Sequence, residues 1–96
     1  MWPALHQHWL FNHPHDVAAD DAGHIYIADT GNNSVQKFTS DGQLINRWGR
    51  PRGIVKKALL PTGLTIDGNR FVYVADGANH CIHKFSTGGV FVARWG

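Results

Sequence analysis

Short apolar runs alternate with clusters of turn-forming residues along the chain. In the first half, the apolar runs fall at 17–19, 25–28, 35–38 and 44–48. They are separated by Asp21-Ala22-Gly23, Thr30-Gly31-Asn32-Asn33 and Ser40-Asp41-Gly42. Such clusters supply the positive backbone angles and the side-chain caps of tight turns. None of the runs has helical spacing, so the pattern predicts a four-stranded antiparallel meander.

The same pattern repeats with a period of 47 residues, and segments 14–49 and 61–96 align without a gap. The residues that recur 47 positions later are Pro14, Asp20, Tyr26, Ala28, Asp29, Asn32, Lys37, Phe38, Gly42, Arg47, Trp48 and Gly49. We therefore expect two copies of one supersecondary unit. A connector at 50–60 joins them, and an N-terminal segment at 1–13 precedes the first copy.

The second strand of each copy indicates how the sheets are arranged. Ile25-Tyr26-Ile27 and Val72-Tyr73-Val74 are apolar at consecutive positions, which predicts that both faces of these strands are buried. Sheets that stack on sheets around an axis bury both faces in this way. The predicted fold class is all-β, with two four-stranded antiparallel β-propeller blades that assemble into a larger ring.

The second and third strands also carry a family resemblance. Residues 25–38 read IYIADTGNNSVQKF, and Asp41-Gly42 and Arg47-Trp48-Gly49 follow them. This sequence closely resembles the NHL repeat. The second copy keeps the frame, although Gly77-Ala78-Asn79-His80 replaces the Thr-Gly-Asn-Asn turn. The resemblance covers residues 11–96 and implies a blade of a six-bladed propeller.

The resemblance is specific for the fold and leaves the function open. NHL propellers serve as protein-binding platforms, RNA-binding surfaces and sensor domains. In one branch they form the amidating lyase that cleaves peptidyl-hydroxyglycine, a zinc enzyme. Each of these functions is therefore an expectation that needs its own residues.

Two blades leave two apolar walls without a covering sheet, and roughly three or more repeats are usually needed for a stable array. Self-association is therefore predicted, most simply as a homotrimer that closes a six-bladed ring with head-to-tail contacts. The alternative is that the chain is a piece of a longer propeller. Apolar residues near the N-terminus are expected to cover a blade face: Trp2, Leu5, Trp9, Leu10 and Phe11.

Composition adds limits to this interpretation. The single cysteine, Cys81, excludes an intrachain disulfide and is expected to be a small buried strand residue. The first residues lack the features of a signal peptide, and no apolar run reaches membrane length. We therefore expect no membrane partner and, by default, a cytoplasmic location. The formal net charge of +2 falls short of a strong nucleic-acid footprint.

Polar residues that recur in both copies are interpreted as structural. Asp29 and Asp76 close the second strand just before a turn, where a carboxylate accepts N–H bonds from the following residues. Trp48 and Trp95 are expected to carry stacked cations. The recurring cations, which are expected at the rim and on the indole rings, are Lys37, Lys84, Arg47 and Arg94.

Seven histidines are the one compositional excess with metal-binding chemistry. The amidating-lyase branch holds zinc with histidines of a Pro-His motif at the start of the innermost strand, and Pro14-His15 matches it. The second copy has Pro61-Thr62 instead, so a zinc site would need three copies of His15 around an axis. Asp16 would then orient His15 or remain a polar rim residue. The alternative is that His15 is a solvated or capping histidine.

The cations of the connector suggest a third function. Arg50, Arg52, Lys56 and Lys57 cluster there, and some NHL domains bind RNA on a basic face. The connector contains no aromatic residue for stacking unpaired bases. We therefore expect a non-enzymatic scaffold that binds a protein or peptide, without a cofactor and without catalytic residues. The alternatives are a zinc-dependent lyase and an RNA-binding surface.

Overall fold

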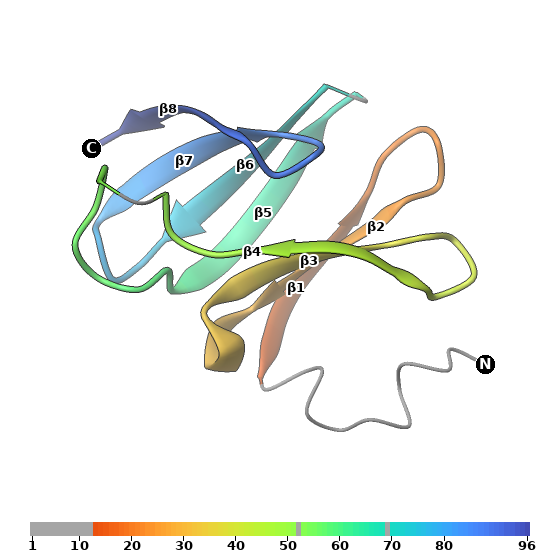
Figure 1. Cartoon of the computed structure of the whole chain (residues 1–96), viewed down its shortest axis with the longest axis horizontal. Helices are drawn as coiled ribbons and strands as arrows, with labels where there is room; N and C mark the ends of the chain where they lie inside the picture. The colour runs from red at the N-terminus through yellow and green to blue at the C-terminus, as the bar shows by residue number, and fades with distance from the viewer. Residues whose placement is uncertain (1–12, 52, 69) are drawn as a thin grey trace.

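The structure is a computed structural model, and it describes residues 13–51, 53–68 and 70–96. It contains two four-stranded antiparallel sheets, each with its strands in sequence order. The first sheet consists of β1 (Pro14–Ala19), β2 (Ile25–Asp29), β3 (Ser34–Phe38) and β4 (Leu44–Trp48), with a short 3-10 turn, η3 (Thr30–Asn32). The second consists of β5 (Pro61–Asp67), β6 (Phe71–Asp76), β7 (Cys81–Ser86) and β8 (Phe91–Trp95). Figure 1 shows the two sheets side by side, and the predicted all-β fold of two meanders is confirmed.

The same local geometry builds the outer hairpin of both sheets. Gly42 and Gly89 have φ angles of +91° and +87°, a conformation that glycine adopts without strain. Their N–H groups donate to the carbonyl oxygens of Thr39 and Ser86, each at 3.0 Å. The 47-residue repeat of the sequence is therefore also a repeat of the structure, because both copies form the same turn, and this turn sets the register of the strands that it joins.

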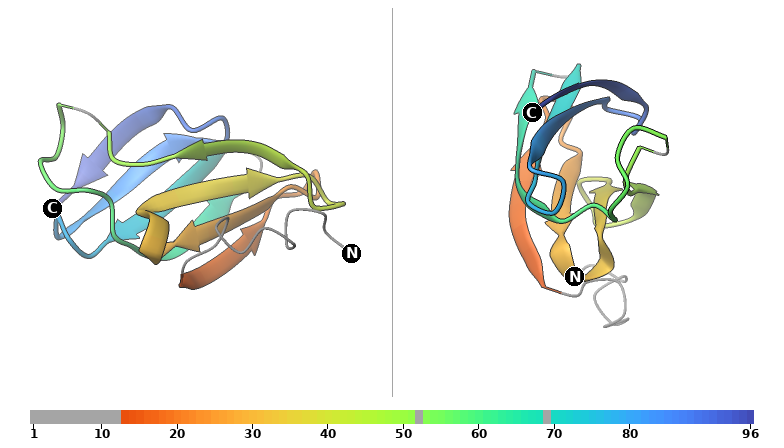
Figure 2. Two further views of the ribbon diagram at one scale, coloured as in Figure 1. Left: turned by 60° about the horizontal axis from the view of Figure 1, so that its bottom comes forward. Right: turned by 90° about the vertical axis from the view of Figure 1, so that its left-hand side faces the viewer.

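The two sheets, called blade 1 (14–48) and blade 2 (61–95) below, pack face to face around one apolar core. Tyr26 and Val35 of blade 1 lie against the core residues of blade 2. The blade 2 members of this core are Val72, Val74 and Phe85, with Leu64, Ile66 and Phe91 packed against them. Leu59, from the connector, is fully buried in the same cluster. Figure 2 shows the twisted sheets from two further directions.

Hydrogen bonds between described residues fasten blade 1 to blade 2 or to the connector, among them the following five. The Thr30 hydroxyl donates to the Pro61 carbonyl at 2.8 Å, and the Lys37 ammonium donates to the Thr87 carbonyl at 2.9 Å. The amide groups of Asn33 and Asn46 donate to the carbonyls of Leu59 and Gly88. The fifth bond joins Leu64 N–H to a carboxylate oxygen of Asp16 at 3.0 Å.

Asp16 therefore has a role that the sequence did not reveal. Its second carboxylate oxygen accepts the N–H of Val17 at 2.9 Å, so the side chain bridges β1 and β5. Gly63 lies beside it, and a Cβ at that position would be 3.8 Å from the Asp16 oxygen. The side chain belongs to the joint between the blades, where it orients strands rather than the His15 ring.

The middle strands of the two blades differ in burial. In β2 the four residues from Tyr26 to Asp29 are all buried, as predicted for a strand covered on both faces. In β6, buried and half-buried residues alternate instead. One face of β6 is therefore only half covered in the single chain, because no sheet formed by the described residues lies on the outer face of blade 2.

Arg47 and Arg94 are two of the four cations predicted at the rim or on the tryptophan rings, and neither lies on the tryptophan that follows it in the chain. Arg47 and Trp48 are consecutive in β4, opposite Gln36 and Val35, and consecutive strand residues project from opposite faces. Arg94 and Trp95 have the same relation in β8. In the described residues, the repeated cation contact joins a lysine to a tyrosine instead. Lys37 lies 5.4 Å from the Tyr26 ring centre, and Lys84 lies 5.8 Å from that of Tyr73.

Candidate functional site

The outer face of blade 2 carries apolar side chains that are partly open to solvent. Its side chains come from β6, β7 and β8, and Ile82 and Trp95 are 46% and 51% exposed. Tyr73, Ala75 and Lys84 are half-buried on the same face. A cavity of about 330 Å³ lies there, lined in part by Tyr73, Ala75 and Ile82. The Trp95 ring leans on Tyr73, with ring centres 6.2 Å apart.

Each of these five residues has a buried or half-buried counterpart in blade 1. The counterparts, 47 positions earlier, are Tyr26, Ala28, Val35, Lys37 and Trp48. The first three of them have no exposed surface, because blade 2 covers them. Trp48 packs on Phe85 of blade 2, with ring centres 5.7 Å apart. The outer face of blade 2 therefore has the residues of an inter-blade contact face without the covering blade.

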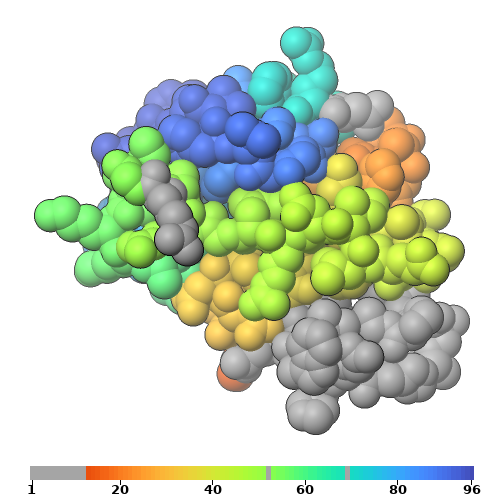
Figure 3. All heavy atoms as spheres, in the orientation of Figure 1, coloured from red at the N-terminus to blue at the C-terminus, as the bar shows by residue number. Residues whose placement is uncertain are grey.

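A second candidate surface lies at the connector. Val55 and Leu59 anchor the connector in the protein interior, while Lys56 and Lys57 remain exposed. The Arg50 guanidinium donates to the carbonyl of Lys56 and so holds the loop in shape. Figure 3 shows the connector, in green, on the surface beside the C-terminal strand, in blue. Arg52, the fourth predicted cation, lies outside the described residues.

A cavity of about 320 Å³ opens between this connector and the β6–β7 turn. Lys56, Lys57, His80 and Arg94 contribute to its lining. The side-chain amide of Asn79 fixes one wall, since its Oδ1 accepts Lys57 N–H at 3.2 Å and its Nδ2 donates to the Lys57 carbonyl at 3.1 Å. Four basic side chains around one hollow favour an anionic ligand.

His15, the predicted zinc ligand, is exposed at the start of β1. The cavity beside it, of about 380 Å³, is lined by Pro14, His15, Asp16, Val17 and Ile27. Among the described residues of this one chain, it contains no second histidine. A site at His15 therefore still requires symmetry-related chains, and it stays a prediction. The N-terminal apolar residues Trp2, Leu5, Trp9, Leu10 and Phe11 also lie outside the described residues.

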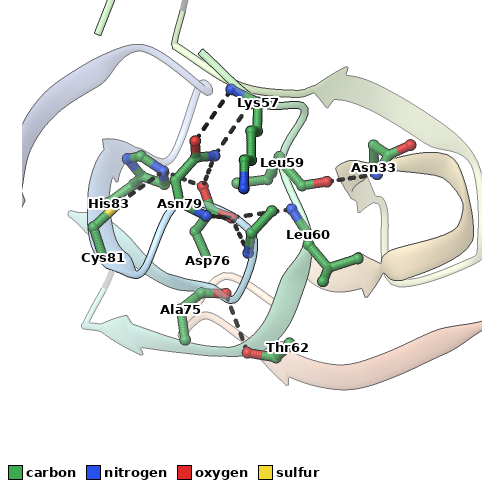
Figure 4. A network of polar contacts seen from close by, with 11 residues as sticks. Asn33, Lys57, Leu59, Leu60, Thr62, Ala75, Asp76, Asn79, Cys81 and His83 are labelled. Atoms are coloured by element: carbon green, nitrogen blue, oxygen red, sulfur yellow. Dashed lines mark hydrogen bonds and ion pairs between the residues drawn. The ribbon is translucent and has the colours of Figure 1, made fainter. Parts of the chain in front are cut away.

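Asp76 caps the β6–β7 turn. One of its carboxylate oxygens accepts the N–H groups of Leu60, Ala78 and Asn79 at 3.1 to 3.3 Å. Figure 4 shows these contacts around the central carboxylate. Burial would by itself raise the pKa of Asp76, but hydrogen bonds from His83, Asn79 and Leu60 outweigh it and hold the pKa below its ordinary value. The carboxylate therefore stays ionised inside the protein.

The other oxygen of Asp76 faces two residues that sequence reasoning did not combine. His83 Nε2 lies 2.7 Å from it, and Cys81 Sγ lies 3.5 Å from the same nitrogen. Burial, and next the negative charge of Asp76, raise the pKa of the Cys81 thiol, while the neighbouring Arg94 opposes this shift. One sequence pattern would have revealed the cluster. It is a Cys-x-His pair on one face of a strand, with an aspartate opposite the cysteine on the neighbouring strand.

Asp29, the counterpart of Asp76, sits at the end of β2 with a different set of partners. Its Oδ2 accepts the side-chain amides of Asn32 at 2.8 Å and Gln36 at 3.1 Å. Ser34 and Gln36 of blade 1 occupy the positions of Cys81 and His83. The two blades thus share the buried aspartate and differ in the chemistry around it.

Blade 1 contains a further buried carboxylate, that of Asp20, and the equivalent carboxylate of blade 2 is not buried. Asp20 accepts the Tyr26 hydroxyl at 2.8 Å, His24 Nδ1 at 3.1 Å and the N–H of Ala22 at 2.9 Å. Burial would raise its pKa, but the hydrogen bonds from Tyr26 and His24 lower it overall. Its counterpart in blade 2, Asp67, is exposed.

Comparison with known proteins agrees with the blade architecture. The model of the NHL repeat matches residues 11–38 and 59–85. A stretch of 39 residues is 44% identical to the Homo sapiens protein "NHL repeat-containing protein 3", and it covers 40% of this chain and 11% of that protein. In the described part of the chain, no helix has the length and apolar character needed to cross a membrane. Since the NHL repeat match extends over more than half of the sequence, the chain belongs to the NHL repeat family.

Proposed function

We propose that this chain is a non-enzymatic NHL propeller module that binds a protein or peptide ligand and completes its ring by self-association. The supporting observation is the outer face of blade 2, which repeats the contact face of blade 1 and is half exposed. The proposed occupant of that face is blade 1 of a second copy of the chain. The proposed setting is the cytoplasm, on the sequence argument given above.

The outer face of blade 1 supports the same assembly at its edge strands β1 and β4, whereas Ile27 and Phe38 in its middle strands are already buried. Val17 and Leu44 are 61% and 45% exposed there. Their counterparts in blade 2, Leu64 and Phe91, pack against the core between the blades. An apolar side chain at these positions therefore fits against a neighbouring blade. Opposite faces of one chain would meet in a head-to-tail contact, the type that closes a ring when the rotation allows it.

Polar complementarity at the proposed joint would be limited to one main contact. Lys84 stands where Lys37 binds the Thr87 carbonyl, and the corresponding acceptor in the next copy would be the Ser40 carbonyl. Three of the other side chains that fasten blade 1 have no polar counterpart in blade 2. Asp16, Thr30 and Asn46 correspond to Gly63, Gly77 and Ala93. Apolar burial would therefore supply most of the stabilisation between copies.

The mass of the protein in solution tests this assembly. Light scattering behind a sizing column is expected to give about three times 10.7 kDa. Ile82→Glu places a charge in the open face and is expected to shift the protein to the monomer. Val90→Glu is the matched control, since Val90 is 67% exposed on the β7–β8 turn, outside that face. A monomeric wild type, or equal dissociation by both variants, would contradict the assembly.

The basic cavity at the connector is the proposed ligand site. Its cations suit the carboxylates of an acidic peptide, and Ile54 and Val55 add apolar contact. No phenylalanine, tyrosine or tryptophan is among the described residues that line it, so only His80 and Arg94 are left to stack on unpaired RNA bases. The cavity therefore favours an acidic peptide over RNA.

Binding of model ligands separates these two classes. A labelled oligo-glutamate peptide is expected to bind the wild type at low salt and to lose most of its affinity in Lys56→Ala/Lys57→Ala. Lys37→Ala is the matched control, because it removes a lysine remote from the connector. A single-stranded RNA of equal charge that binds more tightly than the peptide would overturn the choice of ligand.

The zinc-dependent lyase remains the competing function, and it makes a distinct demand. It requires metal held by His15 from several copies, with a base and a carboxylate-binding group nearby. His15→Ala would then abolish zinc binding. It would also abolish the lyase reaction, in which a peptidyl-hydroxyglycine substrate is cleaved without hydrolysis. We favour the non-enzymatic module because the described lining of the cavity at His15 includes no cation that could hold the carboxylate of a peptide substrate.

A further inference from the structure

Three buried side chains of blade 2 converge on one point inside the protein. The ligand-capable atoms of Asp76, Cys81 and His83 all lie within 4.8 Å of one another. Asp76 comes from the end of β6, and the other two come from alternate positions of β7, on the same face of the sheet. Cys81 retains the most exposure of the three, 7%, and His83 has none. A carboxylate, a thiol and an imidazole are the common ligand types of zinc.

The spacing suits a tetrahedral ion. Zinc bonds of about 2.3 Å to sulfur and about 2.0 Å to nitrogen place those two atoms roughly 3.5 Å apart at the tetrahedral angle. Cys81 Sγ and His83 Nε2 are separated by 3.5 Å. The Asp76 oxygen, at 2.7 Å from His83 Nε2, would have to move outward by about half an ångström. The third pair, the Asp76 oxygen and Cys81 Sγ, lies within 4.8 Å and would close to roughly 3.5 Å around the ion.

Surrounding groups already orient the three side chains. Three backbone N–H groups hold the far oxygen of Asp76. Its near oxygen accepts the Asn79 side-chain amide at 2.7 Å and faces His83 Nε2 at the same distance. The His83 ring packs against the rings of Phe85 and Phe91, with centres 5.8 and 6.3 Å away. Oriented ligands bind metal more tightly, because less freedom is lost on binding.

The two ring nitrogens of His83 have different surroundings. Nε2 faces Asp76 and Cys81, whereas Nδ1 is buried and has no hydrogen-bond partner in the part of the chain that the structure describes. A metal binds a ring nitrogen that carries no proton, so with Nε2 on the metal the single ring proton would sit on Nδ1.

Blade 1 shows what the same frame looks like without metal ligands. Asp29 is shared, but Ser34 and Gln36 stand in place of Cys81 and His83, and the Gln36 amide donates to Asp29 at 3.1 Å. Side-chain amides from Asn32 and Gln36 thus bind this buried aspartate in blade 1. A thiol and an imidazole at these two positions add metal-binding capacity that the fold itself does not require.

We propose that Asp76, Cys81 and His83 form a binding site for a divalent transition metal ion, best suited to Zn²⁺. Binding would release the thiol proton of Cys81 to solvent and form bonds from the metal to the sulfur, the imidazole nitrogen and the carboxylate oxygen. One thiolate and one carboxylate neutralise the charge of the ion, as a buried site requires. The metal would clamp the β6–β7 hairpin, and Asp76 would connect it to Leu60 at the start of blade 2. The site does not depend on self-association.

The test uses the full chain, purified without chelator, stripped of metal and then titrated with Zn²⁺ and with Co²⁺. We expect one metal ion per chain, a rise in Tm with Zn²⁺, and thiolate-to-metal charge-transfer absorption with Co²⁺. Cys81→Ser/His83→Gln copies the residues of blade 1 and is expected to stay folded while the bound metal falls below one-tenth per chain. His80→Ala, which removes an exposed histidine from the adjacent turn, is the matched control and is expected to keep the metal.

A folded wild type that binds no stoichiometric metal would overturn the proposal, as would undiminished binding in the double variant. The second result would assign the metal to other histidines, such as His15. If the double variant fails to fold, the Co²⁺ spectrum of the wild type decides. Absence of the thiolate band would then exclude Cys81 as a ligand, and its presence would support the site.

Discussion

Blade 1 and blade 2 have almost the same backbone design and very different surroundings. Tyr26 and Val35 of blade 1 are fully buried. Of their counterparts in blade 2, Tyr73 is half-buried and Ile82 is exposed. Neither local sequence nor strand pairing explains this, because the register is the same in both blades. Burial in this fold is therefore a property of a position in the stack of blades, and each blade depends on the next one for its stability.

A tyrosine pair tests this dependence with the largest expected effect. Tyr26→Ala removes a fully buried ring and is expected to lower the free energy of unfolding by about 3–5 kcal/mol. Tyr73→Ala is expected to cost less in a monomeric chain, since its ring is only half-buried. Urea denaturation of both variants measures the difference. Equal costs in a chain shown to be monomeric would contradict the distinction between covered and open faces.

Gly89 tests the close contact between the β7–β8 turn and blade 1. A Cβ at Gly89 would lie 2.7 Å from Trp48 Cε3, and its φ is +87°. Gly89→Ala is expected to cost about 2–4 kcal/mol, from backbone strain and overpacking together. Gly53→Ala is the control, because Gly53 has a φ of +78° but nothing within 4 Å, so strain alone should cost about 1–2 kcal/mol. Thermal unfolding that gives the two variants the same Tm would argue against contact with Trp48.

Asp20 and Asp67 extend the comparison to pH. Asp20→Asn is expected to cost about 1–3 kcal/mol at pH 7, because a buried, hydrogen-bonded charge is lost. The pKa of Asp20 is lowered in the folded protein, so its contribution is complete above its ordinary value of 3.8 and is lost as the pH falls through the folded value. The difference between variant and wild type should therefore shrink in acid. Asp67→Asn, at an exposed site, should change stability by less than about 0.5 kcal/mol.

The lysine pair gives the smallest expected difference. Lys37→Ala removes the bond to the Thr87 carbonyl and the contact with the Tyr26 ring, and is expected to cost about 1–2 kcal/mol. Lys84 lies 3.9 Å from the Phe71 ring centre, and Lys84→Ala should cost about 0.5–1 kcal/mol in the monomer. A larger cost for Lys84→Ala that depends on protein concentration would place Lys84 in a contact between copies.

The candidate surfaces were only partly predictable from the sequence. The four cations of the connector were identified, yet the sequence could not show that Lys56 and Lys57 share a hollow with His80 and Arg94, which follow much later in the chain. Cations were expected on the tryptophan rings, but each recurring arginine projects from the strand face opposite to the tryptophan that follows it. The buried cluster of Asp76, Cys81 and His83 was missed, because each residue was considered alone.

The sequence by itself determined the strands, the turns and the two-fold repetition. These depend on local preferences, such as that of Gly42 and Gly89 for a positive φ, and on short apolar runs. Both act between residues close in the chain and do not depend on where the sheet lies in the protein. The tertiary structure alone decided which copy of each residue is covered and what it meets. Asp16 reaches Leu64, and Gly89 rests on Trp48, because two sheets pack face to face. Such contacts join residues far apart in the chain, and no local preference specifies them.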